Sequence, residues 1–144
     1  MSKINPILAP AAEPDNASGG AEVNEAQWRA VRVNALRALV ELQVEPVPGV
    51  TRLSDFGWGS DEELVTLRVS DASNALECYI RGRITAADLQ LWADALEGRD
   101  DLGFDPRHSP RLKDLLFQLS TPEINGAITP EVASRWLIAL TRLA

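Results

Sequence analysis

The sequence is poor in the residues that most often build chemical sites. Its 144 residues include one cysteine, Cys78, and one histidine, His108. A single cysteine cannot form an intramolecular disulfide, and this pair of residues cannot supply the paired ligands of a structural zinc site. We therefore expect no metal, no other cofactor and a cytoplasmic location, where thiols stay reduced.

Long apolar runs and basic clusters are also missing. No segment approaches the roughly 20 apolar residues of a transmembrane helix. Residues 1–21 contain three prolines and lack the apolar core of a signal peptide, so we expect a disordered tail ahead of one domain at residues 22–144. The chain has 21 acidic and 14 basic side chains, a net charge of -7. Phosphate binding needs a basic face, so neither nucleic acid nor a membrane surface is an expected partner.

Catalytic patterns are equally scarce. The sequence has no glycine-rich phosphate loop, no HExxH and no nucleophile elbow. A nucleophilic pair of Cys78 and His108 is the one alternative. Cys78 lies within a predicted helix, next to Tyr79, which we expect to be buried. A free cysteine in such a position usually acts as a small buried hydrophobe. The sequence thus predicts no catalytic residue and a protein that is not an enzyme.

Helical patterns dominate what is present. Residues 21–44 lack glycine and proline and place an apolar residue on one stripe at every turn, which predicts a helix that Pro46 and Pro48 end. Residues 47–59 are expected to form a structured loop, in which Phe56 and Trp58 either cover the core or contact a partner. The spacing of Ser60 and Glu63 predicts a capping box and a helix over residues 61–69, although the β-branched residues of this segment leave a strand as the alternative. Asp71 or Ser73 is expected to cap the next helix.

One helix start occurs twice. Residues 82–96 read GRITAADLQLWADAL and residues 126–140 read GAITPEVASRWLIAL, so Gly, Ile, Thr, Trp, Ala and Leu recur in the same six positions. In each copy the threonine is expected to cap the helix and the tryptophan to face the core. With a leucine-striped helix near residues 110–120, the pattern predicts an all-α fold of five or six antiparallel helices in a single compact, bundle-like domain.

Charge is unevenly distributed along the chain. Residues 45–105 contain thirteen acids and five bases, whereas residues 107–144 contain three acids and five bases. Such polarity steers a body toward an oppositely charged partner, although moderate acidity also keeps ordinary proteins in solution. The candidate partner-binding residues are the acids around the first copy of the motif, an apolar residue expected among them and the loop tryptophan: Asp88, Leu91, Asp94, Glu97, Asp100, Asp101 and Trp58.

The stretch GRITAADLQLWADALEGRDD, the later PEINGAITP and Trp136 together resemble small bacterial immunity proteins of contact-dependent or polymorphic toxin systems. The resemblance covers roughly the C-terminal half. It implies a non-enzymatic inhibitor that occludes a cognate toxin, and many such toxins are basic nucleases. The alternative is an acidic helical adaptor or chaperone that docks a basic protein. In either case we expect a monomer or a weak dimer.

Overall fold

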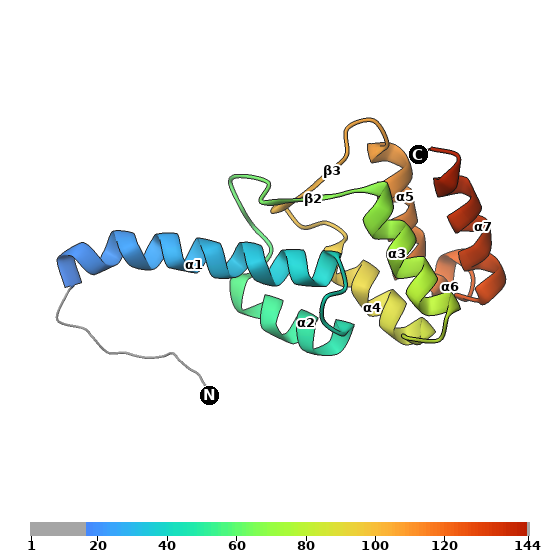
Figure 1. Cartoon of the computed structure of the whole chain (residues 1–144), viewed down its shortest axis with the longest axis horizontal. Helices are drawn as coiled ribbons and strands as arrows, with labels where there is room; N and C mark the ends of the chain where they lie inside the picture. The colour runs from blue at the N-terminus through green and yellow to red at the C-terminus, as the bar shows by residue number, and fades with distance from the viewer. Residues whose placement is uncertain (1–16, 144) are drawn as a thin grey trace. The chain divides into compact units, whose positions relative to one another are not determined.

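The chain is mostly helical and divides into two units (Figure 1). The computed structural model describes the backbone of residues 17–143 and the side chains of residues 25–143. The units are Met1–Arg32 and Val33–Ala144, and the border falls within helix α1 (Ala17–Val40). Residues 1–16 of the expected disordered tail lie outside the described residues, and the backbone is helical from Ala17 onward. The sites considered below all belong to Val33–Ala144.

After α1 the elements are short. In chain order they are α2 (Pro46–Leu53), the 3₁₀ helix η2 (Ser54–Phe56), β2 (Val65–Leu67), α3 (Val69–Ile80), α4 (Ala86–Leu96), β3 (Leu102–Phe104), α5 (Ser109–Ser120), α6 (Pro122–Asn125) and α7 (Pro130–Thr141). Helix α2 packs against α4, α4 against α5, and α3 against α7. The expected predominance of helix is confirmed. The finer expectation of five or six antiparallel helices is not met, because the described chain has seven α-helices and a strand pair.

Strands β2 and β3 lie side by side and run parallel (Figure 1). Val65 and Leu67 are buried on one face of β2, and Thr66 between them is exposed. The helix predicted for residues 61–69 is therefore wrong, and the strand alternative is correct for Val65–Leu67. Ser60 forms a local turn instead of a cap, since its hydroxyl donates to the carbonyl of Glu62 (2.7 Å) and accepts from its N–H (3.3 Å).

The end of α1 departs from the sequence pattern. The helix stops at Val40 in a left-handed turn at Leu42, whose φ is 52°. Gln43 N–H donates to the Ala38 carbonyl at 2.8 Å, which satisfies a carbonyl of the last turn. Pro46 then begins α2, so the expected loop over residues 47–59 is largely helical. The sequence pattern predicts that Pro46 ends a helix, but the fixed φ of proline also suits the first position of a helix, and Pro46 occupies that position in α2.

The doubled motif caps helices as predicted. The Thr85 hydroxyl accepts from Asp88 N–H at 3.0 Å, and the Thr129 hydroxyl accepts from Val132 N–H at 3.2 Å. The two tryptophans differ in their surroundings. Trp92 is fully buried, whereas Trp136 is half-buried.

Helix α3 begins at Val69, at least three residues earlier than expected. Arg68 occupies the position before the first turn, and its N–H donates to the Asp71 carboxylate at 2.9 Å. The prediction that Asp71 or Ser73 precedes the helix is therefore wrong. Asp71 lies inside the first turn, where its carboxylate accepts the hydrogen bond from Arg68 N–H.

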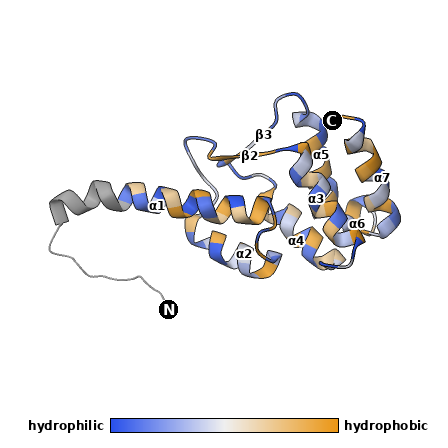
Figure 2. Ribbon diagram, viewed as in Figure 1, coloured by the Kyte–Doolittle hydropathy of each residue, from blue (hydrophilic) through white to orange (hydrophobic). Residues whose placement is uncertain are grey.

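Leucines fill the core beneath these helices. The apolar residues of α4 and α5 are joined there by Ala35, Leu36 and Leu39 from α1. The indole N–H of Trp92 donates to the Leu39 carbonyl at 3.0 Å and ties α4 to the end of α1. In Figure 2 the longer helices of this unit carry both hydrophobic and hydrophilic residues along their length, as expected of helices with one face on a core.

Candidate functional site

A buried ion pair follows α4. Arg99 Nε lies 2.8 Å from one Asp101 oxygen and Arg99 Nη2 lies 3.1 Å from the other, with side chains 4% and 0% exposed. Arg99 Nη2 also donates to the Gly57 carbonyl at 2.6 Å. The sequence predicts that the Asp101 carboxylate lies on the partner-binding surface. That prediction is wrong for Asp101, because Arg99 engages both of its oxygens inside the protein.

The pair holds the loop that carries Trp58. The guanidinium carbon of Arg99 lies 5.2 Å from the centre of the Trp58 ring, within cation–π range. The Trp58 carbonyl accepts from Asp100 N–H at 3.1 Å. The ring nevertheless stays 52% exposed, whereas Phe56 is half-buried against the core. The two loop aromatics thus have different environments, and Trp58 is the one that faces solvent.

Trp58, Leu91 and Asp94 line one cavity of about 250 Å³. Its apolar wall also includes Val50 from α2, and Arg99 lies at its inner side. Leu91 is half-buried there, so its side chain forms part of the cavity wall and does not project into solvent. Asp94 is exposed and forms no ion pair with any described residue. The structure therefore brings together three of the residues that the sequence proposed, and adds the arginine behind them.

A second hollow of about 380 Å³ shares Arg99 with the first, so the two are neighbours. Glu97 and Asp100 line it, together with Glu63 from the loop before β2. All three carboxylates are exposed. A cation opposes them, since Lys113 lines the same hollow with its ammonium 5.5 Å from the Phe104 ring. We call Glu63, Asp94, Glu97 and Asp100 the acidic rim.

Asp88 is separate from both hollows. Its carboxylate accepts from Thr85 N–H at 3.0 Å and completes the reciprocal cap of α4. A carboxylate that is engaged in a helix cap is less available to a partner. Asp88 therefore serves the start of α4, and the acidic rim lies around the end of that helix.

Sequence reasoning missed Arg99 and Glu63. Arg99 is one of five bases among thirteen acids in residues 45–105, and nothing in a one-dimensional pattern marks an arginine as buried. Glu63 was assigned to a helix cap that does not form. A usable signal for Arg99 was its place two residues before Asp101 and directly after Gly98, whose φ of 83° turns the chain.

Cys78 and His108 do not form a pair. The Cys78 thiol has Asn74 as its neighbour at 4.0 Å, late in α3. His108 lines a hollow with Val69, Ser70 and Ser73 of α3, and Cys78 is not among the residues of that hollow. Near His108, the backbone N–H of Arg107 lowers the pKa of Asp105, and its guanidinium acts in the same direction.

Comparison of the chain with protein-family models, curated proteins and solved structures gives no match. Among the described residues, no group of three or more acids, histidines and cysteines could hold a metal ion. No helix in this part of the chain has the length and apolar character needed to cross a membrane.

Proposed function

We propose that this chain is a non-enzymatic immunity protein that binds and neutralises a cognate toxin domain through Trp58 and the acidic rim. One observation carries the proposal: a half-exposed tryptophan is held by a buried ion pair beside Asp94, a carboxylate that forms no ion pair with the described residues. Tryptophan is enriched among the residues that dominate binding energy at interfaces. Holding its loop in place before binding reduces the ordering cost of association.

The cavity beside Trp58 suggests which chemistry the partner brings. A lysine or arginine side chain could lay its methylenes against Leu91 and its cation beside Asp94. The other carboxylates of the acidic rim would raise the rate of encounter with a basic surface at low salt. A basic domain, such as a nuclease, is therefore the partner that fits this surface.

The immunity assignment itself rests on the sequence resemblance. An adaptor or chaperone that docks a basic protein would use the same contacts, so binding alone does not separate the two functions. Neutralisation does separate them, because only an inhibitor abolishes the toxicity of the domain that it binds.

The test is growth rescue in cells that express the domain encoded immediately upstream of this gene. We expect the wild-type chain to restore growth, and Asp94→Lys to bind the purified domain about 2 kcal/mol, or roughly 30-fold, more weakly. Glu123→Lys is the matched control, because it makes the same charge change at an exposed site on α6. Binding without rescue would favour the adaptor, and equal loss in both variants would remove the acidic rim from the interface.

A further inference from the structure

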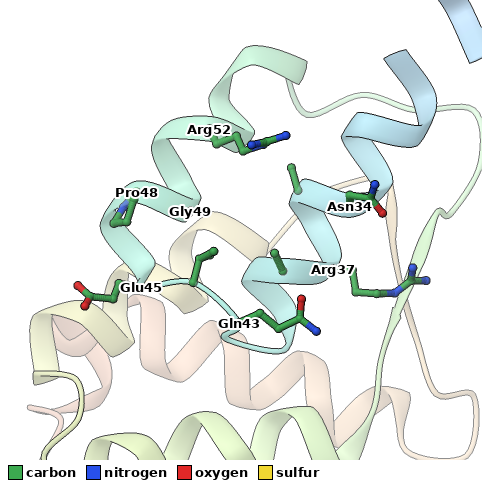
Figure 3. Close-up of a pocket in the computed structure, with 10 residues that line it drawn as sticks. Asn34, Arg37, Gln43, Glu45, Pro48, Gly49 and Arg52 are labelled. Carbon is green, nitrogen blue, oxygen red and sulfur yellow. The ribbon is translucent and has the colours of Figure 1, made fainter. Parts of the chain in front are cut away.

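A larger groove lies between the last turns of α1 and helix α2 (Figure 3). Its volume is about 810 Å³, and its apolar lining includes Ala35, Ala38, Val44 and Pro48. At Gly49, which also lines the groove, a Cβ atom would lie 2.9 Å from the Val44 side chain, so α2 packs closely on the preceding segment. Different residues of α2 line this groove and the Trp58 cavity. The two sites are therefore distinct.

The charge of the groove is opposite to that of the acidic rim. Arg37 and Arg52 both line it, and neither guanidinium group forms an ion pair with any described residue. Figure 3 shows Arg52 extending from α2 toward α1, while Glu45, the one acidic lining residue, points away from α1. Arg37 extends from α1 away from α2 in the same view, so Arg52 is the cation that is directed into the groove.

Apolar surface continues beyond the groove. Val44 is 39% exposed and Val47, on the neighbouring turn of α2, is 57% exposed. A groove with an apolar floor and charged edges matches the way in which an amphipathic helix docks, with apolar side chains inserted and charged ones at the edges. Here the α2 edge supplies the Arg52 guanidinium group, which can bind a carboxylate in two-point geometry.

From the apolar floor and Arg52, which forms no ion pair with a described residue, we infer that this groove binds an acidic amphipathic helix of a partner protein. The helix would insert leucine-like side chains between Ala38 and Pro48 and place Asp or Glu beside Arg52. This inference is independent of the proposed function, since it concerns another surface and a partner of the opposite charge.

The test selects peptides on the full chain. A phage-displayed library of random 12-residue peptides is panned on the immobilised wild-type protein, and clones that also bind Ala38→Trp, in which an indole fills the groove, are discarded. We expect the remaining peptides to be rich in Asp, Glu and large apolar residues. The best of them, synthesised and labelled, should bind Arg52→Glu at least tenfold more weakly than wild type.

The control is Arg83→Glu, the same charge reversal at an exposed arginine outside the groove. It should change the affinity less than twofold, and circular dichroism of each variant confirms that it folds. The inference is overturned if no groove-dependent peptide is recovered, if the recovered peptides are basic, or if both charge reversals weaken binding equally. None of these results involves the toxin domain, so the proposed function is judged separately.

Discussion

Asp101→Asn should strongly destabilise the protein, whereas the same change at the adjacent Asp100 should not. The two positions differ in burial, since Asp101 is fully buried against Arg99 and Asp100 is exposed. The amide keeps the size of the carboxylate but removes its charge, and it turns an NH₂ group toward the arginine donors. Arg99 would then remain as a buried cation without its counter-ion.

Breaking one side of a buried ion pair costs about 3–5 kcal/mol. Val33–Ala144 is a unit of about 110 residues, for which 1 kcal/mol corresponds to a change of roughly 4 °C in Tm. Asp101→Asn should therefore lower Tm by roughly 12–20 °C. A change at an exposed acid typically stays within about 0.5 kcal/mol, or roughly 2 °C for Asp100→Asn.

The assay is thermal unfolding followed by circular dichroism, with urea unfolding as a second measure of the free energy of unfolding. The reasoning fails if Asp101→Asn unfolds within a few degrees of Asp100→Asn. That result would mean that the Arg99 pair does not hold the loop, and Trp58 would lose the rigidity on which the proposed interface depends.

Three further predictions concern the helix caps, the core and one carboxyl group. Thr85→Ala should lower the free energy of unfolding by about 1 kcal/mol through loss of the α4 cap, Thr129→Ala should do the same for α7, and Thr85→Ser is the control that keeps the hydroxyl. Trp92→Phe should lower the free energy of unfolding in urea by about 2 kcal/mol, because it removes buried volume and the hydrogen bond to the Leu39 carbonyl. A free energy of unfolding equal to that of wild type would contradict the placement of Trp92 in the core. The pKa of the Asp105 carboxyl, measured by NMR, should lie below the ordinary value of 3.8, so its contribution to stability is present above that pH and is lost as pH falls further. A pKa above 3.8 would refute its bond to Arg107 N–H.

Local rules predicted two of the helix starts correctly. Thr85 and Thr129 cap their helices because a hydroxyl beside free N–H groups needs no distant partner. The buried stripe of α5 is likewise readable from its spacing, since Leu112, Leu115 and Leu116 recur at helical intervals. Signals of this kind lie within a few residues of their effect, and a sequence displays them directly.

The failures come from interactions between distant segments. Val65 and Leu67 form a strand because Leu102 and Phe104 lie alongside them, and that pairing crosses more than 30 residues. The sequence indicates a surface acid at Asp101, because it does not show that Arg99 binds this carboxylate and the Gly57 carbonyl in the folded chain. Part of the acidic rim could be foreseen from charge density, but the cavity beside Trp58 exists only once α2, α4 and the loop meet.

The central claim, that Trp58 anchors a toxin domain, is tested most directly by one affinity measurement. The Kd of the purified cognate domain is measured by calorimetry for wild type, Trp58→Ala and Phe117→Ala, the last being an aromatic of similar exposure on α5. We expect Trp58→Ala to weaken binding by at least about 2 kcal/mol, roughly 30-fold, and Phe117→Ala to leave it unchanged. Equal affinities for Trp58→Ala and wild type would contradict the account.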